Sequence, residues 1–273
     1  MSNFSKNAFV DEPEQVPIRH AATVMIVDER PDLQVLMVQR TSRAVFGASA
    51  WVFPGGRVDP TDATELDDVT HGLSDADASA MLEVAEHGRA WWFAGLRETL
   101  EEVGLLIGAA GAADHLVDHA RAAVQADATV FAQTLRNDGL RLDLTELHEV
   151  ARFVTPLGPP RRFDTRFFVA AAPAGQEPSP DEEEVVRHEW VRPREAIDRW
   201  RRDEFPLMSV THRMLSCLSR YPTLDALLTR ASTRGPQQRV RVNDPDGAYH
   251  VLLPGEPGYD TAELEIEHGW VRI

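Results

Sequence analysis

The sequence has a single cysteine, Cys217, a single lysine, Lys6, and no long apolar run. One cysteine excludes an intrachain disulfide and a Cys-x-x-Cys site, and it fits a reducing compartment. We expect Cys217 to be a small buried hydrophobic residue, because no catalytic signature surrounds it. No stretch approaches the roughly 18 apolar residues that a membrane-spanning helix needs, and the N-terminus lacks the basic-then-apolar order of a secretory signal. We therefore expect a cytoplasmic protein that has no part in a membrane.

Basic residues are also scarce relative to acidic ones. The 273 residues contain 28 Lys and Arg against 44 Asp and Glu, which gives a formal net charge of −16. This charge has the wrong sign for a protein that binds nucleic acid through counterion release. A polyanionic ligand would have to meet a local basic patch or a bound cation. A small-molecule partner is therefore expected, and no nucleic acid.

The order of expected elements indicates an α/β layered protein. Residues 1–17 are polar and are expected to form a flexible tail, residues 18–200 a main domain with an inserted segment at about 60–88, and residues 201–273 a C-terminal extension packed on it. The predicted strands are 21–27, 34–40, 152–155, 166–172 and one that ends at 190–191, and the predicted helices are 78–86, 89–103, 112–136 and 194–201. In the extension we expect helices at 207–219 and 223–232, a hairpin over 239–253 and a strand over 264–273.

The helix over 89–103 carries the most informative pattern. At about 100° per residue, Glu98, Glu101 and Glu102 share an arc of roughly 100°, while the apolar side chains face the opposite direction. Like charges at such spacing repel one another by some tenths of a kcal/mol. Carboxylates on one rigid face suit Mg²⁺ or Mn²⁺. On the helix alone, a solvated acidic face is the simpler interpretation, with Arg97 offsetting part of the charge.

The residues around this helix resemble the Nudix box, G-x5-E-x7-R-E-U-x-E-E-x-G-U, where U is aliphatic. Gly56 matches the first glycine, Arg97-Glu98 and Glu101-Glu102 match the core, and Gly104-Leu105 match the end. Thr99 stands in place of an aliphatic residue, and a long insertion splits the box. A split box is similar to that of the peroxisomal coenzyme A diphosphatase branch and its bacterial relatives. Further similarities to that branch are the Thr155-Pro156 pair, the segment 161–168, Trp190 and the late Leu253-Pro254-Gly255.

The resemblance implies a fold and a set of site residues. The fold is a Nudix α/β/α sandwich around a mixed sheet, with a helical insertion in the box and a C-terminal helix–hairpin extension. The ligands of Mg²⁺ or Mn²⁺ would be Glu101 and Glu102, together with Glu98, which could instead orient the attacking water. Arg97 would hold the carboxylates by ion pairs. Enzymes of the family are often dimeric, so a homodimer is expected by analogy.

Residues outside the box complete the expected site. Glu184, the last acid of an acidic loop, is our choice for a further metal ligand, the alternative being a solvated loop. Gly55 and Gly56 permit close approach of a ligand. Substrate phosphates could be bound by basic residues of two segments, although those of the second segment could instead pair with Asp164. The candidates for phosphate binding are Arg40, Arg161 and Arg162.

The expected reaction is metal-dependent hydrolysis of a diphosphate linkage in a nucleoside-diphosphate derivative. Coenzyme A or an acyl ester of it is the leading substrate by the resemblance. The alternatives are NADH, ADP-ribose or a nucleotide sugar, and, from a different class of protein, a non-catalytic nucleotide-binding sensor. Asp62 stands at the position of the first glutamate of the box. The three core glutamates, Glu98, Glu101 and Glu102, are all present, which argues against the sensor.

Overall fold

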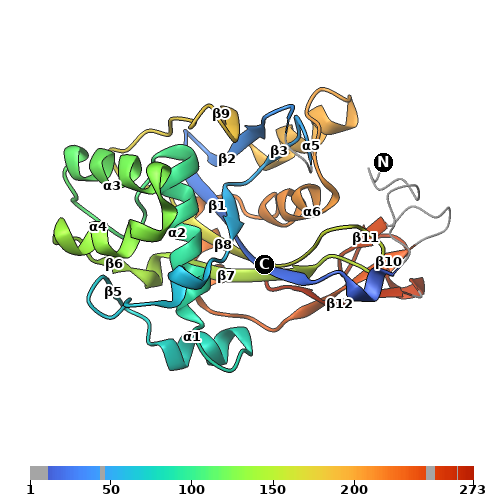
Figure 1. Ribbon diagram of the computed structural model, residues 1–273. Helices are drawn as coiled ribbons and strands as arrows, with labels where there is room; N and C mark the ends of the chain where they lie inside the picture. The colour runs from blue at the N-terminus through green and yellow to red at the C-terminus, as the bar shows by residue number, and fades with distance from the viewer. Residues whose placement is uncertain (1–11, 44–46, 244–249, 263) are drawn as a thin grey trace.

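The computed structural model describes residues 12–43, 47–243, 250–262 and 264–273, and its centre is a mixed β-sheet (Figure 1). Within these ranges the sheet has ten strands in the order β11-β10-β12-β7-β8-β1-β2-β3, with β4 paired to β1 and β9 paired to β2. The strands are β1 (Ile18–Glu29), β2 (Leu33–Arg40), β3 (Trp51–Val52), β4 (Gly55–Arg57), β7 (His148–Val154), β8 (Arg162–Ala171), β9 (Val185–Val191), β10 (Gln238–Asn243), β11 (His250–Leu252) and β12 (Leu264–Val271). The central pair, β1 and β8, is parallel, and the other pairs of this sheet are antiparallel. A separate parallel pair joins β5 (Thr70–His71) to β6 (Leu142–Asp143).

Helices cover both faces of the sheet. They are α1 (Asp75–Leu82), α2 (Arg89–Val103), α3 (Asp114–Ala126), α4 (Phe131–Asn137), α5 (Pro193–Arg201), α6 (Ser209–Leu218) and α7 (Leu224–Ser232). Figure 1 shows α2, α3 and α4 on one side of the sheet and α5 and α6 on the other. Alternating residues of β1 divide accordingly, since Val24 and Ile26 join the core beneath α2 whereas Met25 and Val27 join the core beneath α6. The predicted α/β layers around a mixed sheet are confirmed.

Helix α2 has the bounds that the sequence predicts. It ends at Gly104, whose φ of 71° lies in the left-handed region that favours glycine, and the Gly104 N–H donates to the Leu100 carbonyl at 2.9 Å. Its apolar side chains pack against β1 and β4. The glutamate side chains therefore lie at a fixed place beside the sheet.

One predicted helix is divided in two. Instead of a single helix over 112–136, the chain forms α3 and α4 with a turn of 3-10 helix between them. The Asp127 carboxylate accepts hydrogen bonds from the N–H and the hydroxyl of Thr129, at 2.9 and 2.6 Å. These local bonds compete with the helical ones and break the helix at Asp127.

The C-terminal extension continues the central sheet. Its helices α6 and α7 and its strands β10, β11 and β12 lie close to the predicted positions, and Trp270 of β12 pairs with Arg152 of β7. Residues 1–11 of the predicted tail and the turn of the predicted hairpin, 244–249, lie outside the described residues. Cys217 is buried in α6, as predicted, and burial raises the pKa of its thiol to about 11. No helix within the described ranges is both long and apolar enough to cross a bilayer.

Candidate active site

A glycine turn brings the chain into close contact with both β1 and α2. Gly55 has a φ of 147°, and a Cβ atom there would lie 2.3 Å from the Ala22 carbonyl oxygen. A Cβ atom on Gly56 would lie 2.4 Å from the Glu98 carboxylate. A side chain at Gly55 would collide with the backbone of β1, so glycine is required there. A side chain at Gly56 would displace the Glu98 carboxylate.

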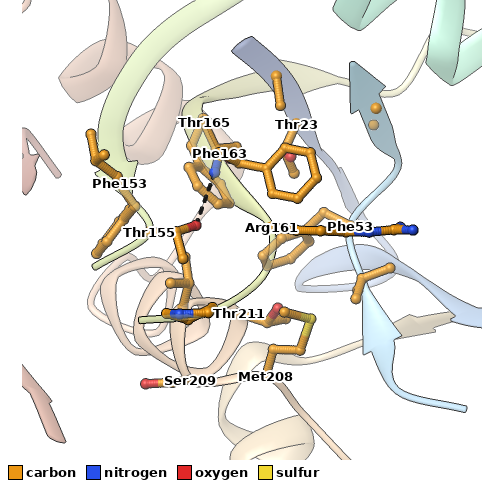
Figure 2. A pocket seen from close by; sticks show the side chains of 18 of the residues that line it. Thr23, Phe53, Phe153, Thr155, Arg161, Phe163, Thr165, Met208, Ser209 and Thr211 are labelled. Carbon is orange, nitrogen blue, oxygen red and sulfur yellow. Dashed lines mark hydrogen bonds between the residues drawn. The ribbon is translucent and has the colours of Figure 1, made fainter. Parts of the chain in front are cut away.

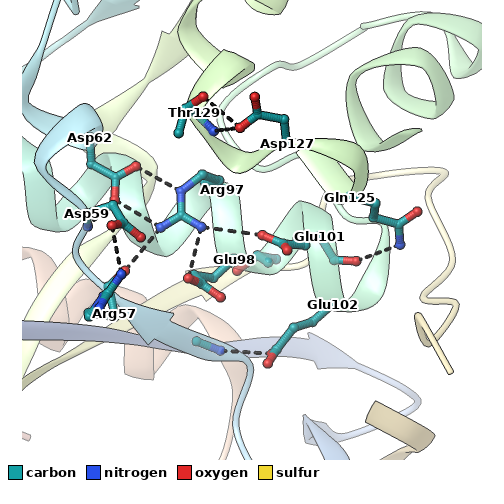
Figure 3. Close-up of polar contacts among 12 residues, drawn as sticks. Arg57, Asp59, Asp62, Arg97, Glu98, Glu101, Glu102, Gln125, Asp127 and Thr129 are labelled. Atoms are coloured by element: carbon teal, nitrogen blue, oxygen red, sulfur yellow. Dashed lines mark hydrogen bonds and ion pairs between the residues drawn. The ribbon is translucent and has the colours of Figure 1, made fainter. Parts of the chain in front are cut away.

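Arg97 is the centre of a buried ion-pair network (Figure 3). Its guanidinium is 2% exposed and donates to both carboxylate oxygens of Asp62, at 2.8 and 2.9 Å. The same group donates to Glu98 at 2.9 Å and to Glu101 at 3.4 Å. The ion pairs expected of Arg97 are thus present. Asp62, which lies in the inserted segment, is the buried partner of this arginine.

Glu102 lies apart from this network although it is on the same helix. Its carboxylate accepts a hydrogen bond from the Gly55 N–H at 3.0 Å, and only 5% of the residue is exposed. Figure 3 shows the side chain directed toward the glycine turn and away from Arg97. The glycine turn therefore lies between Glu98, which is next to Gly56, and Glu102, which is bonded to Gly55.

Burial and repulsion from neighbouring carboxylates disfavour the charged forms of the three glutamates. Burial raises the pKa of Glu98 to about 7 against the opposing charge of Arg97, and Glu101 adds to the increase. Burial raises the pKa of Glu102 well above its usual value, and the charge of Glu98 raises it further. Burial also raises the pKa of Glu101, again against Arg97. A cation near these carboxylates would stabilise their charged forms.

The acidic loop before β9 lies beside the C-terminal end of α2. The Asp181 N–H donates to the Glu102 carbonyl at 3.0 Å, and the Asp181 carboxylate accepts bonds from the N–H groups of 183, 184 and 185. This turn holds Glu184 close enough for its charge to raise the pKa values of Glu101 and Glu102. Glu184 is thus positioned near the helix glutamates, and its side chain is exposed.

The donor set suits a divalent cation, although its present arrangement does not form a closed site. Among the described residues, no three His, Cys, Asp or Glu side chains are grouped so that they could hold a metal ion. The reason is visible in the contacts, because Glu98 and Glu101 turn toward Arg97 whereas Glu102 turns toward Gly55. Carboxylate oxygens crowded beside one shared arginine are hard ligands of the kind that Mg²⁺ and Mn²⁺ prefer. By chemistry and charge the residues fit such an ion.

A cavity of about 440 Å³ opens at the glycine turn (Figure 2). Five of the residues predicted for the site line it, namely Gly55, Gly56, Arg40, Arg161 and Glu184. Arg162 is not among its lining residues. It is buried, and its Nε donates to the Thr155 carbonyl at 3.1 Å. Arg166 is buried on the α2 side of the sheet, where it pairs with Glu149 at 2.9 Å.

Sequence reasoning missed the aromatic and hydroxyl-bearing lining of this cavity. Phe163, Thr165 and Phe167 of β8 line it together with Phe53, Phe153 and Met208. The alternation of residues 163, 165 and 167 along one strand is a signal that could have found one wall. The contribution of Met208 depends on the packing of α6 over the sheet, for which the local sequence has no signal.

Comparisons with known proteins match the chain to Nudix proteins. A family model described as the NUDT19 Nudix domain matches residues 78–209. The chain is 28% identical to the acyl-coenzyme A diphosphatase NUDT19 of Gallus gallus, over 88% of this chain and 79% of that protein. It is 24% identical to the Xenopus laevis protein of the same name, over 84% of this chain and 72% of that one. A crystal structure of a Nudix hydrolase from Alicyclobacillus acidocaldarius superposes with a TM-score of 0.66 and 28% identity, covering 79% of this chain and 97% of the other.

The fold, the box and these matches define a Nudix hydrolase, an enzyme that hydrolyses diphosphate linkages. Within that class the chain is related to the acyl-coenzyme A diphosphatases named NUDT19. The family and branch that the split box predicts are confirmed.

Proposed function

We propose that this protein hydrolyses the diphosphate linkage of coenzyme A or an acyl-coenzyme A, with Mg²⁺ or Mn²⁺ as the cofactor. The observation that carries the proposal is the placement of Glu98 and Glu102 directly against the glycine turn that opens into the cavity. The names of the two curated relatives support the choice of substrate.

The metal ligands would be Glu98, Glu101 and Glu102, with Glu184 added from the acidic loop. When bound, a divalent ion would lower the pKa of a water molecule and neutralise charge that develops on phosphoryl oxygens. Arg97 would keep the glutamates in position through its buried ion pairs, without touching the substrate.

The substrate diphosphate would lie between the glycine turn and the arginines of the cavity. Gly55 and Gly56 allow phosphate oxygens to approach the backbone, and Arg40 and Arg161 offer planar guanidinium groups that bind phosphate with two parallel hydrogen bonds. Arg162 does not line this cavity, so its proposed substrate contact has no support from its position.

The test replaces Glu102 with Gln, which keeps the shape of the side chain but removes its charge. We expect kcat to fall by roughly 10²–10³-fold, the range seen when one electrostatic stabiliser of a transition state is lost. Turnover would be measured with Mg²⁺ and with Mn²⁺ on coenzyme A, acyl esters, NADH, ADP-ribose and nucleotide sugars. Chelation with EDTA should abolish turnover by the unmodified protein.

Glu86→Gln is the matched control, because Glu86 is 76% exposed and lies outside the cavity. It should keep the activity of the unmodified protein, and circular dichroism should show that both variants are folded. Full turnover by Glu102→Gln would contradict the catalytic assignment. Activity confined to NADH, ADP-ribose or a nucleotide sugar would contradict the substrate. Nucleotide binding without any turnover would indicate a sensor.

A further inference from the structure

The cavity lies on the face of the sheet opposite the glutamate helix. Along β8, the side chains of Phe163, Thr165 and Phe167 line the cavity, whereas Asp164 and Arg166 lie on the other face. A substrate whose diphosphate is held at the glycine turn must therefore extend under α6, away from α2.

The C-terminal extension forms the far wall of this cavity. Its contribution comes from the first turn of α6 and from the two outermost strands of the sheet. The residues that it supplies to the cavity after residue 209 are Val210, Thr211, Val242 and Val251. The family model ends at residue 209, so this wall is built outside the matched segment.

The chemistry of the lining changes along the cavity. Its charged groups are Arg40, Arg57, Arg161 and Glu184, none of which comes from the extension. The extension supplies mainly apolar side chains, among them Val210, Val242 and Val251. In the part of the chain that the structure describes, its lining has no Asn, Gln, Asp or His side chain that would pair with the edge of a nucleobase.

Hydroxyl groups are spaced between these apolar side chains. Thr23, Thr165 and Thr211 line the cavity, and Thr155 accepts a hydrogen bond from the Phe163 N–H at 3.1 Å (Figure 2). A hydroxyl can donate or accept, so it can satisfy an amide group on a flexible arm while the rest of the lining contacts methylene groups. This pattern matches a long apolar arm with few polar groups better than it matches a flat base.

We propose that the cavity receives the acylated arm of the substrate, so that the C-terminal extension sets the preference for acyl-chain length. This inference rests on the proposed function and extends it to specificity. Each methylene buried against this wall should increase kcat/KM by about 4-fold until the cavity is full.

The test compares coenzyme A with its acetyl, hexanoyl and dodecanoyl esters. For the unmodified protein we expect kcat/KM to rise from coenzyme A to the hexanoyl ester and then to level off. Val210→Trp fills the space beneath α6 and should lower the ratio of kcat/KM for the hexanoyl ester to that for coenzyme A by at least about 10-fold. Met208→Ala enlarges the cavity and should shift the preference toward the dodecanoyl ester.

Ile18→Trp is the control, because Ile18 is 43% exposed and does not line the cavity. This variant should keep the ratio of the unmodified protein. The same ligands would also be titrated by calorimetry in EDTA, where binding is measured without hydrolysis. The hexanoyl ester should bind more tightly than coenzyme A, and Val210→Trp should remove the difference.

The two measurements separate this inference from the proposed function. If the protein hydrolyses none of these compounds but the binding preference and its loss in Val210→Trp are seen, the inference holds and the proposed function fails. If Val210→Trp weakens coenzyme A and its hexanoyl ester equally, or if the unmodified protein shows no dependence on chain length in either measurement, the inference is overturned.

Discussion

His212 lies in α6 with its ring 4.2 Å from the ring of Trp200, and its Nε2 atom is buried and has no hydrogen-bond partner among the described residues. The pKa of His212 falls from 6.5 to about 4, mainly because of burial, with smaller contributions from the charges of Arg213 and Arg201. Because the unfolded chain binds a proton near pH 6.5 and the folded protein does so only near pH 4, unfolding becomes more favourable as the pH falls through this window. Above pH 6.5 the residue has no such effect.

We therefore predict that His212 lowers the free energy of unfolding by on the order of 1 kcal/mol between pH 6.5 and pH 4, after allowance for its partial exposure. The glutamates whose pKa values are raised contribute with the opposite sign, so the comparison with the His212 variant isolates this effect. Urea denaturation at pH 7 and pH 4.5 would measure the loss. His212→Gln should reduce it, whereas His115→Gln, at an exposed position of α3, should not. An unchanged pH dependence in His212→Gln would contradict the assignment.

The glutamates and the arginine of the box could be predicted as a group from their spacing on one helix. Their individual partners could not. Asp62 pairs with Arg97 and the Gly55 N–H binds Glu102, and these contacts join residues far apart in the sequence. Spacing along one helix determines which side chains share a face. Which residues of other segments contact that face depends on the fold.

At the scale of elements, the inserted segment holds the start of α2. This helix begins after Gly88, which has no capping side chain of its own. Instead the Ser79 hydroxyl of α1 accepts a hydrogen bond from the Gly88 N–H at 2.9 Å, and the Asp75 carboxylate accepts one from the Arg89 N–H at 3.1 Å. The insertion thus supplies the cap that the glutamate helix lacks.

Ser79→Ala should lower the free energy of unfolding by about 1–2 kcal/mol, because the buried Gly88 N–H loses its acceptor. Ser232→Ala is the control, since that serine is exposed and should change stability by less than about 0.5 kcal/mol. Denaturant titration would measure the free energies of unfolding of the two variants and of the unmodified protein. Equal stability of the two variants would exclude a capping role for Ser79.

The elements themselves were predicted best where the signal is local. The periodicity of residues 89–103 and the glycine at 104 gave the bounds of α2, whereas the turn at Asp127 within the predicted helix over 112–136 was missed. The pairing of β12 with β7 could not be predicted at all, because a strand does not encode which distant strand it will join. For the same reason, the order of the strands in the sheet could not be predicted from the sequence.

At the scale of the whole molecule, Glu149 joins the sheet to both the insertion and the extension. This buried carboxylate of β7 accepts hydrogen bonds from Arg166 of β8 at 2.9 Å and from Arg234, just after α7, at 3.2 Å. The same two arginines also donate to the carbonyl oxygens of Leu82 and Met81 at the end of α1. One acidic group therefore connects three parts of the chain.

Glu149→Ala should lower the free energy of unfolding by about 3–5 kcal/mol, because it leaves the buried Arg166 without its nearest counter-charge and removes the partner of the half-buried Arg234. Glu149→Gln should cost less, since it keeps a hydrogen-bond acceptor. The control is Glu204→Ala, which removes an exposed ion pair with Arg202 worth about 1 kcal/mol or less. Denaturant unfolding would measure all three, and a small effect of Glu149→Ala would contradict the proposed connection.

The parallel pairing at the centre of the sheet also affects how the chain folds during synthesis. Ile18 of β1 aligns with Arg162 of β8, so a ribosome must add roughly 140 residues, over about 10–30 s, before the first strand can meet this partner. During that interval the apolar segment from Val24 to Val27 lacks its parallel neighbour. The nascent protein therefore exposes an apolar strand that chaperones or other chains could bind. Slower translation would prolong that exposure.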